Sequence, residues 1–398
     1  MAGGGRFAPT KAHPLTYSAL GAGAFLVLYL PQPILPLLDQ ELHSSPTLTG
    51  LLMTFGLLGF AVSGFLPEGD PRRSLKLAIV LILLSSAGAV IAPNLYFLLP
   101  VRAAQGVGVG LLIAGGLADV ARRMPADKAG RYTGALVAGT AVGGLLSRMT
   151  GYSALFFGWR AAFAVGAVGT LALAGLAIRS LPPEPDEGDR QPAGSGRVPI
   201  TLVLAGLGIL FVNIAVFDLL PYRLEGPPFH LPAVLADLVY FAFVPATLAA
   251  GVAGRGVDRL GARKVVLLSC AFGLLLILSS LATSVLTTVL AAVGSICCTV
   301  GLHVAHSGAA AAHGRRAVGR YLAAYYVGGA AAAPLAAAAF QSWGWIGMVI
   351  PVCTALLIVG LLALFSPPSR WRPHMSTGIP PPSALPSATW PSSISGCL

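Results

Sequence analysis

Charged side chains are scarce in this 398-residue sequence, because only 10% of the residues are Asp, Glu, Lys or Arg. A typical soluble domain has roughly 25%. Hydrophobic residues make up 56% of the chain, so a soluble fold of this length would have too few charges to cover its surface. The composition therefore excludes an ordinary soluble domain and predicts that lipid is the solvent for most of the chain.

Motifs that carry catalytic or metal chemistry are also missing. The five cysteines form no CxxC pair and no Cys/His spacing typical of a metal site, so we expect no metal and no other cofactor. No GxxxxGK[ST] loop for ATP-driven transport is present. An enzyme should show clustered catalytic residues and a sensor should carry a soluble output domain. We find neither, and a membrane-embedded enzyme or sensor is kept only as a remote alternative.

Long apolar runs are abundant instead. A bilayer crossing needs roughly 20 apolar residues, and the chain contains twelve runs of about this length. We therefore expect an all-α membrane protein with twelve transmembrane helices. The runs lie near residues 15–38, 47–67, 75–93, 95–118, 132–154, 159–180, 199–221, 232–252, 265–283, 285–309, 321–341 and 345–366.

The basic residues test this arrangement. If the N-terminus lies in the cytoplasm, 21 of the 25 Lys and Arg residues fall in cytoplasmic segments, as the positive-inside rule requires. The formal net charge of +11 is then an orientation signal, and no nucleic-acid partner is expected. The sequence predicts a multi-pass protein of the inner membrane, surrounded by the lipid bilayer, with both termini in the cytoplasm.

Two polar segments, rich in Pro with Gly or Ser, divide the chain and read as flexible. The expected domains are a cytoplasmic N-terminus (1–14), an N-terminal six-helix bundle (15–180), a cytoplasmic linker (181–198), a C-terminal six-helix bundle (199–366) and a flexible cytoplasmic tail (367–398).

The two bundles repeat each other. The triplet Gly130-Arg131-Tyr132 recurs 189 positions later as Gly319-Arg320-Tyr321, and Gly139 recurs as Gly328. Because each half has six helices, both halves lie in the same orientation, as in parallel repeats about an axis along the membrane normal. Two such pseudo-symmetric halves would enclose a cavity near the middle of the bilayer.

A charged loop follows the predicted eighth span, with the pattern G-x-x-x-D-R-x-G-x-R-K. Its residues are Gly254, Asp258, Arg259, Gly261, Arg263 and Lys264, and a degraded copy with Gly64, Glu68 and Arg73 follows the second span. In these two loops the sequence resembles the major facilitator superfamily. The resemblance covers roughly residues 15–366, and we expect a monomeric secondary transporter that works by alternating access.

In such a transporter the charged loop would latch the cytoplasmic ends of the two halves together. Asp258 would pair with an arginine or cap a helix N-terminus, and Arg263 and Lys264 would meet carboxylates or helix C-termini. Gly254 and Gly261 would permit the turn and a close approach of helices. The alternative is that these charges only anchor the loop on the cytoplasmic side.

Arg102 and Gln105 in the fourth span match the RxxQGxG motif of the resembling antiporters, which implies a role in proton coupling. A charge at the centre of a membrane helix costs about 2.5–3.5 kcal/mol on insertion scales, so we expect Arg102 to face the bundle interior. Snorkelling to the headgroups is the alternative. Asp237 in the eighth span is the expected proton carrier, and Arg102 would favour its charged form.

Two further sets of residues are candidates for the transport path. Gly139, Gly143 and Gly144 form a small-residue face in the fifth span, with Arg148 expected near the outer end of that span. Packing alone is an alternative role for this glycine face. The polar or aromatic candidates for the substrate cavity are Tyr29, Gln32, Asn213, His303 and His306.

The beginning of the chain, Tyr29-x-x-Gln32-Pro33-x-Leu35-Pro36, resembles bacterial exporters of the arabinose-efflux type. We therefore expect proton-coupled efflux of a small drug-like or metabolite solute, with protons as the second partner. Proton-coupled uptake of a sugar or an organic acid is the alternative.

Overall fold

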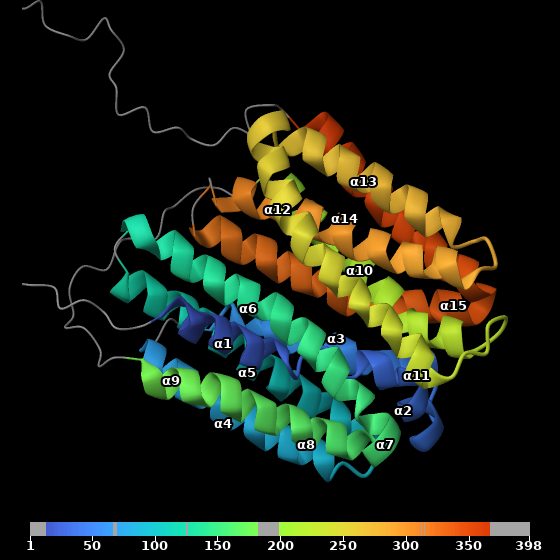
Figure 1. Ribbon diagram of the computed structural model, residues 1–398, viewed down its shortest axis with the longest axis horizontal. Helices are drawn as coiled ribbons and strands as arrows, with labels where there is room; N and C mark the ends of the chain where they lie inside the picture. The colour runs from blue at the N-terminus through green and yellow to red at the C-terminus, as the bar shows by residue number, and fades with distance from the viewer. Residues whose placement is uncertain are drawn as a thin grey trace, which may run out of the picture.

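The computed structural model describes residues 13–66, 70–124, 126–181, 199–311, 313 and 315–366, and all regular structure in these ranges is helical. Most of the long helices run along the longest axis of the molecule (Figure 1). The elements before residue 181 are α1 (Pro14–Phe25), η1 (Gln32–Ile34), α2 (Leu35–Glu41), α3 (Pro46–Ser63), α4 (Pro71–Val90), α5 (Leu95–Arg123), α6 (Ala126–Tyr152), α7 (Ala154–Phe157), α8 (Trp159–Thr170), η2 (Leu171–Gly175) and α9 (Leu176–Ser180).

The later elements are α10 (Ile200–Glu225), α11 (Ala233–Ala236), η3 (Asp237–Ala242), α12 (Phe243–Leu260), α13 (Ala262–Ser279), α14 (Val285–Ala311) and α15 (Arg315–Phe365). Figure 1 shows the elements before residue 181, coloured blue to green, below those after residue 199. We call these the N-terminal and C-terminal helix groups.

Nine helical stretches in the described ranges are long and apolar enough to cross a membrane. One of them spans 49 residues, Ala317–Phe365, and contains Gly344 with the non-helical angles φ 60° and ψ −149°. A positive φ is accessible to glycine without steric cost, so α15 is two helices that meet at this residue. α1, with 12 residues, and α6 are not among the nine stretches.

The internal repeat is visible in how the helices pack. A Cβ atom on Gly139 of α6 would lie 2.0 Å from the carbonyl oxygen of Ser18 on α1, and one on Gly328 of α15 would lie 1.9 Å from that of Leu207 on α10. Leu207 follows Ser18 by 189 positions, as Gly328 follows Gly139. The same glycine thus permits the same close helix contact in each group.

The first predicted span, 15–38, is not one continuous helix. α1 ends at Phe25, and turns lead to η1 and α2. The physical reason is the set of prolines at positions 31, 33 and 36, because proline has no N–H and cannot continue the i→i−4 ladder. Gln32 N–H bonds the Tyr29 carbonyl, three residues back. The carbonyl groups of Val27 and Leu28 therefore lack helical donors.

The bundle has two ends, which we call the α2 end (residues 35–46, 226–232 and 341–344) and the α9 end (residues 176–181, 260–264 and 364–366). Among the described residues, four side-chain hydrogen bonds join the N-terminal to the C-terminal group. They are Gln32–Asp218, Asp39–Tyr222, Thr47–Gln341 and Thr54 to the carbonyl of Ala330. These bonds hold the two groups together from the middle of the bundle to the α2 end.

Candidate transport site

Arg102 on α5 fills the gap that the broken first helix leaves. Its side chain is 1% exposed, and its guanidinium donates to the carbonyls of Val27 at 3.1 Å and Leu28 at 2.6 Å. A third bond reaches the Leu52 carbonyl on α3 at 3.3 Å. In lipid every backbone polar group must be satisfied within the protein, so Arg102 supplies donors that the prolines removed.

Gln105 and two glycines complete this cluster. Gln105 accepts a hydrogen bond from Arg102 and donates to the Ser86 hydroxyl at 2.8 Å. A Cβ on Gly56 would lie 2.8 Å from Arg102 Nη2, and one on Gly106 would lie 1.9 Å from the Gly56 carbonyl oxygen. The close approach of α3 and α5 thus leaves room for the guanidinium but none for a larger side chain.

The expected partnership between Arg102 and Asp237 is not present. In the described part of the chain, Arg102 donates to four carbonyl oxygens, all in the N-terminal group, whereas Asp237 lies in η3 of the C-terminal group. Arg102 faces the bundle interior, as expected, but its observed contacts stabilise the backbone of a broken helix. The prolines upstream explain the difference.

A second buried arginine, Arg148 on α6, lies where the two groups meet. It is 1% exposed, and aromatic rings surround its guanidinium, whose central carbon is 3.9 Å from the Phe243 ring centre, 4.6 Å from Tyr29, 5.6 Å from Tyr240 and 5.7 Å from Phe217. Cation–π attraction of this kind is stronger when the pair is desolvated. Arg148 lies about one turn before the end of α6, near the end of its span as expected, and it is also buried between the helix groups.

Gln32 connects Arg148 to a carboxylate on the other helix group. Arg148 donates to the Gln32 side-chain oxygen and, at 2.7 Å, to the Gly144 carbonyl. The Gln32 amide nitrogen donates to Asp218 on α10 at 2.6 Å. Gln32 is fully buried and Asp218 is 3% exposed. The row Arg148, Gln32, Asp218 is therefore a buried polar link between the N-terminal and C-terminal groups.

Several buried polar atoms near this link have no hydrogen-bond partner within the described ranges. They are Arg148 Nε, Asp218 Oδ2, both carboxylate oxygens of Asp237 and Asn213 Nδ2. Asp237 is 2% exposed, and its electrostatic neighbours include Glu225 and Tyr240. Buried polar groups without partners are costly, so this region is suited to binding protons or a solute.

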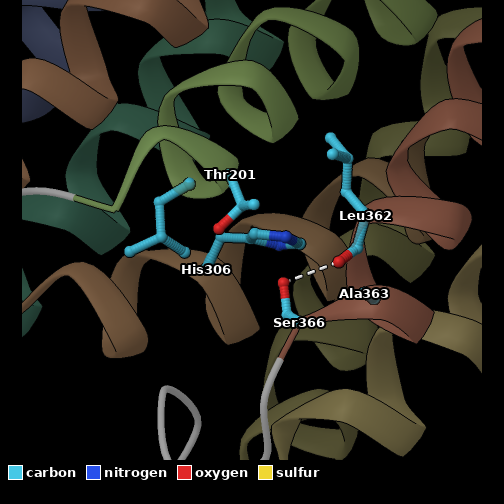
Figure 2. A pocket seen from close by; sticks show the side chains of 6 residues that line it. Thr201, His306, Leu362, Ala363 and Ser366 are labelled. Atoms are coloured by element: carbon cyan, nitrogen blue, oxygen red, sulfur yellow. Dashed lines mark hydrogen bonds between the residues drawn. The ribbon is translucent and has the colours of Figure 1, made fainter.

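His303 and His306 lie on α14 among tyrosines of α15. His303 Nδ1 is 3.0 Å from the Tyr321 hydroxyl, and its ring centre is 4.7 Å from that of Tyr325. His306 donates from Nδ1 to the Leu302 carbonyl at 2.8 Å. Figure 2 shows its imidazole beside Thr201 on α10 and Ser366 directly after α15. The two imidazoles thus have different surroundings, and the described residues contain no group of three or more His, Cys, Asp or Glu side chains placed to hold a metal ion.

An aromatic contact also joins the two groups. The rings of Phe60 on α3 and Tyr326 on α15 have centres 3.9 Å apart, and Phe25 packs against both Phe60 and Tyr29. Tyr29, predicted as a cavity residue, thus lies between this aromatic contact and Arg148.

The glycine face of α6 is divided between two directions. Cβ atoms on Gly139 and Gly143 would lie 2.0 and 2.3 Å from carbonyl oxygens of α1, whereas Gly144 faces Arg148 and Tyr29. Gly139 and Gly143 thus set the spacing of α1 and α6. Gly144 leaves its carbonyl accessible to the arginine one turn later.

The charged loop lies at the α9 end. Asp258, Arg259 and Lys264 are exposed, and Arg263 donates to the carbonyl of Leu364, near the end of α15, at 2.5 Å. Gly261 has φ 86°, which makes the turn between α12 and α13, whereas a Cβ on Gly254 would meet no atom within 4 Å. Gly254 therefore makes no close helix contact in this conformation.

The copy of this loop after α3 is described only in part. Glu68 lies outside the described residues. Gly64 follows the last residue of α3, and Arg73 is exposed on α4, 3.7 Å from Asp70. Asp70 accepts a hydrogen bond from the backbone N–H of Arg72 and caps α4, as aspartate before proline commonly does.

Sequence reasoning missed the roles of Arg148 and Asp218. Both are charged residues within apolar runs, which is a signal for a functional site in a membrane protein. Arg148 was placed near the outer end of its span, and Asp218 was a polar candidate with an interfacial position as the alternative. A position near the end of a span does not mean exposure here, because the broken first helix places η1, with Gln32, beside both residues.

Comparison with known proteins identifies the family. The sequence profile of the Major Facilitator Superfamily matches residues 18–315. YybF, an uncharacterized MFS-type transporter of Bacillus subtilis, is 26% identical over 379 residues, covering 87% of this chain and 90% of the relative. SCO4007, a probable transporter of Streptomyces coelicolor, is 30% identical over 365 residues, covering 86% and 84%. A crystal structure of a D-xylose–proton symporter has the same fold, with a TM-score of 0.68 at 16% identity over 90% of this chain and 98% of that chain. Because the profile covers most of its length, the chain belongs to the major facilitator superfamily of transporters.

Proposed function

We propose that the protein is a secondary active transporter that exports a small drug-like or metabolite solute in exchange for protons. In this proposal it has twelve transmembrane helices in two six-helix halves. Nine stretches qualify by length and composition, α15 contains a second helix after Gly344, and α6 and the broken unit of α1 and α2 are the remaining two.

The α9 end faces the cytoplasm in this proposal, and the α2 end faces outward. The positive-inside rule supports this orientation, because Arg179 on α9 and the charged loop lie at the α9 end. The inner membrane follows as the location, with both termini inside. The four hydrogen bonds between the helix groups then close the outer side, so the conformation is the one that would open toward the cytoplasm.

The observation that carries the proposal is the pair of buried carboxylates near the contact between the halves. Asp218 is 3% exposed and Asp237 is 2% exposed, and neither forms an ion pair within the described ranges. An ionised carboxylate is expensive in such surroundings unless it is paired. Each acid can therefore gain and lose a proton as the halves move and water reaches it from one side or the other.

In this proposal the aromatic residues near Tyr29 and Phe60 contact an apolar or aromatic solute. The fold shared with a sugar–proton symporter does not select a direction of transport, and the flux measurement below distinguishes export from uptake. In this proposal the solute and the proton compete for the same site and therefore move in opposite directions. Proton-coupled uptake of a sugar or an organic acid is the second candidate.

Flux measurements in proteoliposomes test the proposal. A panel of fluorescent aromatic compounds and sugars is first screened by thermal stabilisation of the purified protein, because a ligand stabilises the state that it binds. Flux of a binding compound is then followed with an imposed pH gradient, with and without an uncoupler. Movement opposite to the proton gradient supports export, and movement along it supports uptake. Flux that ignores the gradient contradicts proton coupling, and an absence of counterflow for every ligand contradicts transport.

A further inference from the structure

We propose that Gln32 is the positioning residue that keeps the outer side closed while the transporter is empty. In this inference, which rests on the proposed proton exchange, Gln32 joins ionised Asp218 on one half to Arg148 on the other. The link is strong when neither a proton nor a solute is bound. Either ligand weakens it, and the two halves can then move.

The orientation of the Gln32 amide is determined by its two partners. A guanidinium has only donors, so the side-chain oxygen of Gln32 must face Arg148. Its nitrogen therefore faces Asp218 and requires an acceptor there, at the observed 2.6 Å. When Asp218 is deprotonated, each of the two hydrogen bonds of Gln32 has one ionised partner and is therefore strong.

The backbone holds Gln32 in this position. Pro31 and Pro33 flank it, and its N–H bonds the Tyr29 carbonyl at 3.0 Å. Proline fixes the φ angle on both sides, and the side chain is fully buried. Gln32 therefore has little freedom to follow Asp218 if the two halves separate, and the hydrogen bond must break.

The ionisable groups that face Asp218 come from several elements. They are Arg148 on α6, Tyr29 in the turn after α1, Tyr240 in η3 and Tyr222 on α10 itself. Among them only Arg148 carries a charge at neutral pH, since tyrosine titrates near pH 10 in water. A change in the charge of Asp218 therefore acts mainly on Arg148, to which Asp218 is joined by the amide of Gln32.

Protonation of Asp218 weakens its hydrogen bond with Gln32 but does not remove it. A proton on Asp218 Oδ2, which has no hydrogen-bond partner in the described ranges, leaves Oδ1 as a neutral acceptor. A hydrogen bond to a charged group contributes about 1.5–3 kcal/mol and a neutral one about 0.5–1.5 kcal/mol. We therefore expect the ratio of closed to open outer ends to change about tenfold between the two charge states.

This arrangement stabilises the outward-closed state of the empty transporter. After the proton leaves to the cytoplasm, ionised Asp218 holds the outer side closed, and the empty transporter stays in that state. A solute arriving from the cytoplasm must take over a partner of Gln32 before the outer side opens. A proton on Asp218 weakens the same closure, so the proton and the solute act on one link.

Spin-label distances measured without solute test the inference. Labels are placed at the exposed positions Gln40 on α2 and Ser342 on α15, in a background without native cysteines, and distances are recorded by double electron–electron resonance over a pH series. The unaltered link should give a short distance at high pH and a growing longer-distance population as the pH falls. Asp218→Asn should give the longer distance at every pH.

Two substitutions of Gln32 distinguish charge transmission from packing. Gln32→Met has a similar length but no amide, and should show the longer-distance population at all pH values. Gln32→Glu places a carboxylate between Arg148 and Asp218, so the link needs a shared proton and the pH dependence should reverse. Thr54→Val is the matched control, because it removes another hydrogen bond between the groups, 2.7 Å long, that involves no charge. It should retain the original pH dependence.

The outcomes separate this inference from the proposed function. If both Gln32 variants keep the original pH dependence while Asp218→Asn loses it, the role of Gln32 is wrong and Asp218 remains a proton carrier. If the starting protein shows one distance at every pH and flux ignores the pH gradient, proton exchange itself is wrong. Size-exclusion profiles identify any variant that fails to fold, and the reversed pH response of Gln32→Glu cannot arise from misfolding.

Discussion

Replacing Arg102 by methionine should destabilise the protein more than it alters coupling. The side chain donates to three backbone carbonyls, those of Val27, Leu28 and Leu52. Methionine fills much of the same volume but provides no donor. The proline-broken segment would then have unsatisfied carbonyl groups in a region that water does not reach.

The expected magnitude follows from these contacts. Interhelical hydrogen bonds in membrane proteins contribute about 0.6–1.7 kcal/mol each, so three lost bonds amount to about 2–5 kcal/mol. A change of 1 kcal/mol shifts the melting temperature of a medium-sized domain by about 2–4 °C. We therefore expect Arg102→Met to lower the melting temperature by about 4 °C or more. Arg102→Lys should lower it by less, because an ammonium group keeps donors but lacks the planar fork.

The assay is thermal unfolding of purified protein in detergent, followed by flux at a temperature where both proteins are folded. Arg160→Met is the matched control, because Arg160 also donates to a carbonyl, that of Ala92 at 2.9 Å, but is exposed. It should change the melting temperature by less than about 2 °C. An Arg102→Met protein with an unchanged melting temperature and abolished proton coupling would refute the backbone role and restore the coupling role.

Three further predictions concern packing, topology and the charged loop. Gly328→Val should strongly lower the yield of folded protein, because a Cβ there would lie 1.9 Å from the Leu207 carbonyl oxygen. Gly319→Val should not, because a Cβ there would meet no atom within 4 Å. Equal yields of the two variants in a size-exclusion assay would contradict the packing. Reporter fusions at position 190 and at the C-terminus should both read as cytoplasmic, and a periplasmic signal at either would overturn the twelve-span topology. Asp258→Asn should reduce transport while expression stays near normal, because it weakens closure of the cytoplasmic side, and Glu68→Gln should matter less; the opposite ranking in a flux assay would show that the first loop is the more important one.

The internal repeat was the most informative long-range feature of the sequence. The offset of 189 between Gly139 and Gly328 predicted equivalent places in two halves, and the packing of each glycine on a helix 189 positions apart agrees with that prediction. Such a signal survives in sequence because a close helix contact tolerates only a small residue. The mostly helical, lipid-facing nature of the chain was predictable for a similar reason, since the cost of charge in lipid acts on each apolar run separately.

The broken first helix was only half predictable. Pro31, Pro33 and Pro36 are visible in the sequence, and the loss of N–H groups at these positions is a local matter. Which residue satisfies the freed carbonyls is decided by the neighbour that the fold supplies. Arg102 was therefore recognised as buried, whereas its partners depended on α5 lying beside the turn after Phe25.

The sequence by itself determined the membrane class, most of the approximate spans and the family, because hydropathy and short motifs are properties of single segments. The orientation that the basic residues favour stays a prediction. Only the tertiary structure decided that Arg148, Gln32 and Asp218 form one link. They come from α6, η1 and α10, and their contact depends on the rotation of each helix about its own axis and on its depth relative to its neighbours. Neither quantity is set by the composition of any one helix, because both result from how all the helices pack together.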